Sequence, residues 1–267
     1  MKIITLIENL VYKQGLLAEH GLSFYIETED RKIIFDTGQS GLFLQNAIKL
    51  GISIEDIDSL VLSHGHFDHI GGLVPFLEKN IKAKVYAKSS IFTPKYSGHA
   101  RTITSQINAE LLEDRLIYVD KITEIARNVF IMPDIPISDS TDTHFIGFNK
   151  RVGNEFVPDE FDDELFLVLK QNEQINIVTA CSHRGITNIC TTAAEHFKLQ
   201  VGLILGGFHM KNCTDEQYEQ IIHYFSLLQP KSVGVCHCTG VEKYSMMTRD
   251  CSANLFYNFT GNEINLE

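Results

Sequence analysis

Hydrophobic and polar positions along the chain form short apolar runs that alternate with amphipathic stretches. The amphipathic stretch at residues 40–52 predicts a helix that closes at Gly51. Buried β-branched runs bounded by turn residues predict strands, and in the first third of the chain these are residues 2–10, 22–30, 32–38, 58–64 and 83–89. A second helix begins within residues 69–80. This strand–helix–strand order indicates an α/β protein.

The last 100 residues repeat this rhythm. The apolar runs at 164–170 and 174–183 predict a hairpin around "QNEQ". Beyond the hairpin, the pattern predicts helices at 185–197 and 214–228 and strands at 201–209 and 232–240. Between the two halves, only residues 116–120 and 128–133 have the character of strands.

Residues 138–164 show no clear period and carry eight acidic and two basic side chains. They predict a long acidic loop or a strand pair with loops. Such a segment is either a lid over a site or a solvated surface excursion, and the sequence leaves both open.

Composition narrows the class of protein. The 267 residues are 44% apolar, enough for a substantial core, and the formal net charge is −11. This charge argues against nucleic acid and anionic membranes as partners, but not against a small anionic substrate at a cationic site. No apolar run reaches the roughly 18 residues that span a bilayer, and "MKIITLIENL" is no signal peptide. We therefore expect a soluble cytoplasmic protein, with homo-oligomers left open.

The six cysteines contain no C-x-x-C pair, and all of them lie in the last third of the chain. In a cytosolic protein they are expected to be reduced thiols. Cys236 and Cys238 flank His237, and in a strand they would point away from it as small buried apolar residues.

The stretch "LVLSHGHFDHIGGL" places three histidines and an aspartate within residues 64–69. In an extended segment His64 and His66 point the same way, while Asp68 and His69 lie beyond them in a turn. Imidazole nitrogens and carboxylates are ligands of zinc and related ions, and four of them suit two ions better than one. Three later apolar runs also end in a histidine, namely His183, His209 and His237. In open α/β sheets, ligands bind beyond the carboxyl ends of the strands. This favours an arrangement in which the strand ends that carry these histidines meet at one edge.

"SHGHFDHIGG" resembles the H-x-H-x-D-H signature of the metallo-β-lactamase superfamily. "IIFDTG", "ACSHRGITN" and "CHCTG" resemble further segments of that family, so the resemblance runs the length of the chain. It implies a single domain over residues 1–267. Residues 89–164 contain an insertion and the acidic segment that is either a lid or a surface excursion. The implied fold is a four-layer αββα sandwich of two mixed sheets with helices outside.

The resemblance also assigns roles to residues. His64, His66 and His183 would hold one divalent ion, Asp68, His69 and His237 would hold the second, and Asp36 would support the ligand loop. Zinc is the expected metal, with manganese and iron as alternatives. Many members carry a bridging aspartate where this chain reads "LILGGFHM", with glycine in its place. His209 then takes over as a ligand, contacts the substrate, or is structural.

The implied activity is hydrolysis of a phosphoester, lactone or similar small anionic substrate by metal-bound hydroxide, with Asp68 in proton transfer. Arg184, beside a predicted helix start, is a candidate for binding the substrate anion. A narrower resemblance, to the branch named after 7,8-dihydropterin-6-methyl-4-(β-D-ribofuranosyl)aminobenzene 5'-phosphate synthase, makes a transferase the main alternative. A non-catalytic metal-binding relative is another alternative. A diiron redox protein is disfavoured, because such relatives usually carry glutamate at the position of His66.

Overall fold

The computed structural model describes residues 1–105, 107, 109–112 and 114–266. The chain folds into two compact units, which are described separately. The first comprises Met1–Asp120, Phe145–Leu165 and Phe259–Leu266, and the second comprises Lys121–His144 and Phe166–Asn258. The single domain expected over residues 1–267 stays a prediction.

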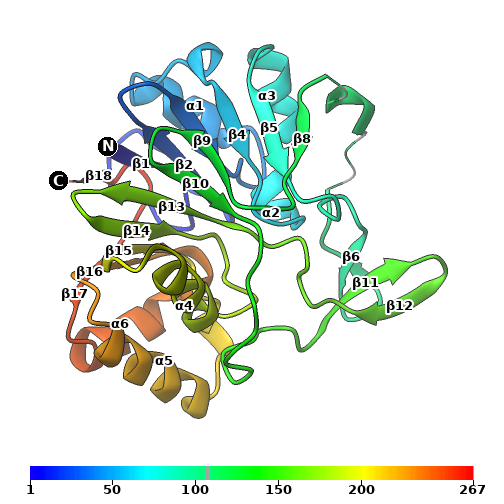
Figure 1. Ribbon diagram of the computed structural model, residues 1–267. Helices are drawn as coiled ribbons and strands as arrows, with labels where there is room; N and C mark the ends of the chain where they lie inside the picture. The colour runs from blue at the N-terminus through cyan, green and yellow to red at the C-terminus, as the bar shows by residue number, and fades with distance from the viewer. Residues whose placement is uncertain (106, 108, 113, 267) are drawn as a thin grey trace. The chain divides into compact units, whose positions relative to one another are not determined.

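The first unit is built on a seven-stranded mixed sheet (Figure 1). Its strands, in spatial order, are β18 (Glu263–Asn265), β1 (Lys2–Ile7), β2 (Ser23–Glu27), β3 (Lys32–Phe35), β4 (Ser59–Val61), β5 (Lys84–Ala87) and β8 (Leu116–Tyr118). The pairs from β18 to β3 are antiparallel and those from β3 to β8 are parallel. The parallel half therefore presents the carboxyl ends of β3 and β4 at one edge.

Helices α1 (Leu42–Lys49) and α3 (Leu73–Lys79) pack on this sheet. Phe43 and Phe76 are fully buried against a sheet face that includes Leu60 and Val85. Burying side chains of this size stabilises the fold by about 1.5–3 kcal/mol each. Short 3-10 turns lie at Ile54–Asp56 and Ala109–Leu112. The helix expected within 69–80 is divided, because α2 (Phe67–Ile70) ends at Gly71 before α3 begins.

A smaller four-stranded sheet completes the first unit. Its strand order is β12 (Glu155–Pro158), β11 (Phe148–Val152), β6 (Lys95–Ser97) and β7 (Arg101–Thr102). The segment 138–164 is thus a strand pair with loops over much of its length, which was one of the two expected forms. The expectation of a solvated surface segment is wrong for half of its acidic side chains. Asp142, Asp159, Asp163 and Glu164 are buried.

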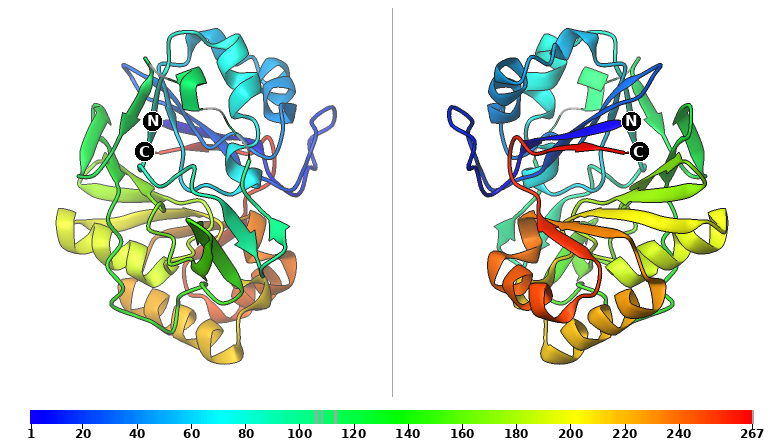
Figure 2. Two further views of the ribbon diagram at one scale, coloured as in Figure 1. Left: turned by 90° about the vertical axis from the view of Figure 1, so that its right-hand side faces the viewer. Right: turned by 90° about the vertical axis from the view of Figure 1, so that its left-hand side faces the viewer.

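The second unit also has a seven-stranded mixed sheet (Figures 1 and 2). Its strands, in spatial order, are β17 (Asn254–Tyr257), β16 (Ser232–Val235), β15 (Gln200–Gly206), β14 (Gln174–Val178), β13 (Phe166–Gln171), β10 (Val129–Met132) and β9 (Thr123–Ala126). β14 to β17 are parallel, and β13 and β14 form the predicted hairpin.

Helices α4 (Ile186–Phe197), α5 (Asp215–Leu228) and α6 (Val241–Asp250) cover this sheet (Figure 2, yellow to orange). Ile186, Ile189 and Ala193 recur at helical spacing and bury one stripe of α4 in the core. Thr214 and Gln217 form a capping box that begins α5 where the sequence predicted it. The hydrophobic pattern did not predict α6, because Met247 is the one residue of this helix that is buried. No helix among the described residues is long and apolar enough to cross a membrane.

The strands leading to the histidines are shorter than predicted. β14, β15 and β16 end at Val178, Gly206 and Val235, and each histidine lies in the turn that follows. His237 begins a 3-10 turn, His237–Thr239, so the strand assumed to run to residue 240 stops earlier. The expectation that Cys238 points away from His237 rested on that strand and is wrong.

Candidate metal centre

In the first unit, Asp36 organises the loop that carries the histidine cluster. Its carboxylate accepts hydrogen bonds from the Ser63 backbone N–H (2.7 Å), the Ser63 hydroxyl (2.6 Å) and His69 Nδ1 (2.7 Å). Asp36 follows β3 and adopts a left-handed φ of 61°. Because all of these groups are buried, the carboxylate ties the ends of β3 and β4 to the start of α2.

These hydrogen bonds determine the tautomers of His64 and His69. His69 donates from Nδ1 to Asp36, so its neutral ring carries the lone pair on Nε2. The Ser63 hydroxyl donates to Asp36 and accepts from His64 Nδ1 at 2.9 Å, which leaves the His64 lone pair on Nε2 as well. Burial, followed by the neighbouring His69 and His66, holds the pKa of His64 well below its usual range. Neutral imidazoles oriented in this way fit a metal ion, because metal-bound histidines usually donate the other ring N–H.

The rings of the cluster lie close together. The ring centroid of His64 is 4.6 Å from that of His66 and 4.3 Å from that of His69. Asp68 Oδ2 lies 3.9 Å from His69 Nε2 and 3.1 Å from His20 Nε2. His20 lies outside every motif, so the sequence does not single it out. Its contact with Asp68 arises only in the folded chain.

The main chain of the cluster is held by an acid from the 138–164 segment. Gly65 N–H, between His64 and His66, donates to Asp163 Oδ2 at 2.7 Å. A Cβ on Gly65 would lie 2.1 Å from the Ile91 carbonyl oxygen, so only glycine fits there. Lys95 bridges Asp163 (2.8 Å) and Asp159 (2.5 Å), and all three side chains are buried. Hydrophobic patterning does not reveal this charged cluster, because its members are far apart in sequence.

We expect Lys95→Met to make stability strongly pH-dependent. Burial already raises the pKa of Asp163, against the attraction of Lys95, and removal of the lysine raises it further. The folded state then binds more protons than the unfolded state, so the free energy of unfolding falls as the pH rises above about 4.

Urea unfolding at pH 5 and pH 8 should show the variant less stable at pH 8. The control is Lys150→Met, which removes the less buried pair with Asp162 and should cost about 1 kcal/mol or less. Equal losses at both pH values would contradict the prediction.

In the second unit, the predicted strand ends do share one edge. β14, β15 and β16 are parallel neighbours, and the turns after them carry His183, His209 and His237. Ser182, His209 and His237 all adopt left-handed φ angles of 51–57°. Non-glycine residues in this region are uncommon and cluster at functional sites. The ring centroids of His183 and His209 are 4.3 Å apart.

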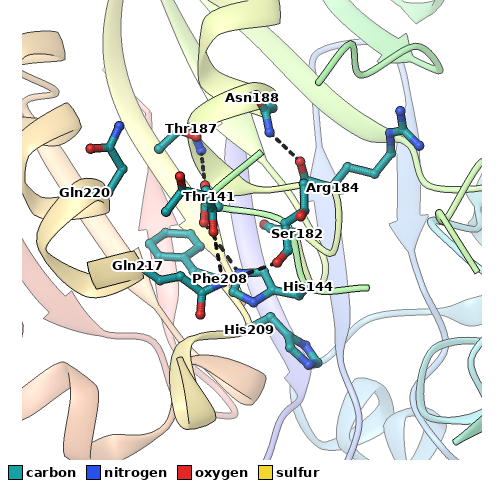
Figure 3. Close-up of polar contacts among 12 residues, drawn as sticks. Thr141, His144, Ser182, Arg184, Thr187, Asn188, Phe208, His209, Gln217 and Gln220 are labelled. Atoms are coloured by element: carbon teal, nitrogen blue, oxygen red, sulfur yellow. Dashed lines mark hydrogen bonds and ion pairs between the residues drawn. The ribbon is translucent and has the colours of Figure 1, made fainter. Parts of the chain in front are cut away.

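The loop before His144 is bound tightly to this edge (Figure 3). Asn188 accepts from Ser138 and Asp139 and donates to the carbonyl oxygens of Asp139 and Arg184. Gln217 of α5 donates to the carbonyl oxygens of Thr141 and Thr143.

These bonds bring His144 beside the predicted histidines. Its backbone N–H donates to the His183 carbonyl oxygen at 2.8 Å, and its ring centroid lies 5.2 Å from that of His209 (Figure 3). Its Nε2 lies 3.5 Å from Asp142 Oδ1. The motifs assign His144 no role, because nothing in its spacing relates it to them, and only its place in a loop region allowed an approach to a substrate.

The start of α4 is not an open anion site. Asp142 Oδ2 already accepts from the Thr187 N–H at 2.7 Å. Arg184 donates from Nε to the Ile135 carbonyl oxygen at 2.9 Å. Its assignment to substrate binding stays a prediction.

Two thiols join the histidines of the second unit. Ligand atoms of Cys181, His183 and His209 lie within 4.8 Å of one another, and so do those of Cys181, His237 and Cys238. Burial alone would raise the pKa of the Cys238 thiol, but hydrogen bonds with Cys181 and His209 and the nearby His237 hold it well below its usual range. All six cysteines lie outside disulfides, as expected.

Known proteins resemble this chain in sequence and fold. The family model described as the metallo-beta-lactamase superfamily matches residues 17–152. An uncharacterized protein of Methanocaldococcus jannaschii is 30% identical over 98% of both chains. The 7,8-dihydropterin-6-methyl-4-(beta-D-ribofuranosyl)-aminobenzene-5'-phosphate synthase of the same organism is 29% identical, covering 94% of this chain and 91% of its own. The crystal structure of Tm1679, described as a metal-dependent hydrolase of the beta-lactamase superfamily, matches with a TM-score of 0.90 and 31% identity. That match covers 100% of this chain and 99% of Tm1679.

Proposed function

Because the chain belongs to the metallo-beta-lactamase superfamily and has its fold, we propose that it is a metal-dependent hydrolase-type enzyme with a two-ion site. Its substrate is a small anionic molecule with a phosphoester, lactone or similar bond. The observation that carries the proposal is the buried cluster of His64, His66, Asp68 and His69. Hydrogen bonds from Nδ1 of His64 to Ser63 and from Nδ1 of His69 to Asp36 leave the lone pair of each ring on Nε2.

The ligand assignment follows the family signature. His64, His66 and His183 would hold the first ion, and Asp68, His69 and His237 would hold the second. Zinc suits a set dominated by imidazole, with manganese and iron as alternatives. His209, with its left-handed backbone, acts either as a further ligand or as a donor to a substrate oxygen.

The chain's own residues prepare the reaction. When bound, a pair of divalent ions activates water near neutral pH and polarises the bond under attack. Asp36 keeps the His69 ring in one tautomer and orientation. Asp68, which is buried and lies 3.1 Å from His20 Nε2, is placed to take a proton and pass it toward His20, whose side chain is 57% exposed.

A transferase is the second candidate, favoured by the 29% identity with the synthase over nearly the whole chain. In that case the ions hold a diphosphate leaving group, and a carbon or amine nucleophile takes the place of water. The glycine that stands where many relatives have a bridging aspartate is compatible with either reaction. A metal-binding relative without catalysis is the remaining alternative.

Elemental mass spectrometry on untagged protein purified without chelator tests the proposal. We expect about two zinc or manganese ions per chain, and turnover of a phosphodiester or lactone substrate that stops on chelation and returns with added metal. Two ions with a blank hydrolysis screen would shift the assignment to the transferase. Absence of bound metal after incubation with zinc or manganese would reject the metal centre itself.

A further inference from the structure

We propose that Cys238 and Cys181 are thiolate ligands of the ion at His237, where they replace the bridging aspartate that many relatives have. This inference deepens the proposed function and rests on it. It adds two ligand residues that the family signature does not assign, and both belong to the second unit. It predicts that sulfur atoms are among the ligands of the second metal ion.

The turn after β16 brings the thiols to His237. Because β16 ends at Val235, residues 237–239 form a 3-10 turn and the alternation of a strand no longer applies. Cys181 comes from the turn after β14, and its Sγ, a ring nitrogen of His237 and Cys238 Sγ all lie within 4.8 Å of one another. Two cysteines and one histidine occur together as ligands in zinc sites, so these three side chains suit a divalent ion.

The glycine pair at the end of β15 explains the position of Cys238. A Cβ built on Gly207 would lie 2.6 Å from Cys238 Sγ and 2.6 Å from the Ala180 carbonyl oxygen. Position 207 is therefore closed to an aspartate, and the Cys238 thiol lies where that side chain would begin. β15 lies between β14 and β16, so the thiol reaches this point from the neighbouring strand.

One hydrogen bond of Cys238 is suited to a thiolate. The other runs from its S–H to the Cys181 carbonyl oxygen at 3.6 Å, and it would be lost when the thiol gives up its proton to bind a metal. In the first, Cys238 Sγ accepts from the His209 backbone N–H at 3.3 Å, and the left-handed conformation of His209 accompanies this contact. A backbone N–H directed at sulfur stabilises negative charge on it. A thiolate also favours zinc over manganese, so the inference narrows the choice of metal.

Cobalt(II) substitution tests the inference without relying on activity. Cobalt bound to thiolate has a sulfur-to-metal charge-transfer absorption in the near ultraviolet, which cobalt bound only by nitrogen and oxygen lacks. We expect the band in the wild-type protein loaded with cobalt, and its reduction in Cys238→Ser and Cys181→Ser. Each variant should also lose up to one of the two ions. The control, Cys251→Ser, replaces a half-buried thiol outside both cysteine–histidine groups and should keep the band and both ions.

The outcomes separate this inference from the proposed function. Wild-type protein that binds two cobalt ions without the sulfur band would overturn the thiolate ligands and leave the two-ion enzyme standing. Failure of the wild-type protein to bind cobalt or zinc at all would overturn both. The wild-type spectrum decides the matter even if a cysteine variant fails to fold.

Discussion

Replacement of His66 with alanine is expected to abolish turnover and to remove at least one metal ion per chain. The His66 ring is buried between Phe148 and Phe161, with centroids 5.5 and 5.2 Å away, and lies 4.6 Å from the ring of His64. An ion that loses one of three imidazoles binds far more weakly, and the water it activates is lost with it.

Metal content and activity of the His66→Ala variant should be measured on the same preparation. The matched control is His223→Ala, an exposed histidine on α5, which should retain both ions and full activity. Circular dichroism should show both variants folded, because removal of one imidazole leaves the Asp36 hydrogen bonds in place. An unchanged metal content in His66→Ala would reject the ligand assignment.

Asp36→Ala is expected to have the largest effect on stability. The substitution leaves three buried donors, the Ser63 N–H, the Ser63 hydroxyl and His69 Nδ1, without their acceptor. Breaking a buried charged network of this kind costs about 3–5 kcal/mol. Released from Asp36, the His69 ring can turn and change tautomer, so metal affinity should also fall about 10–100-fold.

Urea unfolding and zinc titration would measure the two effects. Asp58→Ala is the control, because Asp58 is a partly exposed aspartate of the same unit whose carboxylate accepts from the Lys32 N–H at 2.9 Å. It should cost about 1 kcal/mol and leave zinc affinity unchanged. If Asp36→Ala and Asp58→Ala lose the same stability and neither changes zinc affinity, Asp36 does not support the metal centre.

Long-range contacts explain which site residues the sequence concealed. His64, His66, Asp68 and His69 share six positions, so chain geometry alone brings them together. His20 reaches Asp68 from 48 residues away, and His144 reaches His209 from 65 residues away. Neither histidine lies at a recognisable spacing from the ligand motifs, and no pattern along one chain reports such long-range pairs.

The same holds for buried charge. The acidic composition of residues 138–164 indicates a solvated surface, and yet Asp159 and Asp163 are buried. Lys95 makes this burial tolerable, and it lies more than 60 residues earlier. A charged residue is tolerated in the interior only when its partner is in place, and composition does not identify the partner.

The sequence by itself determined the local features of this protein: the order of most strands and helices, the capping box of α5 and the ligand cluster at residues 64–69. Each depends on residues a few positions apart, where period, turn chemistry and ligand type are read directly. The tertiary structure decided where strands stop, which acids are buried, and that Cys238 faces His237. These depend on hydrogen bonds and close contacts between distant segments, such as the approach of Gly207 to Cys238, which exist only once the sheet has formed.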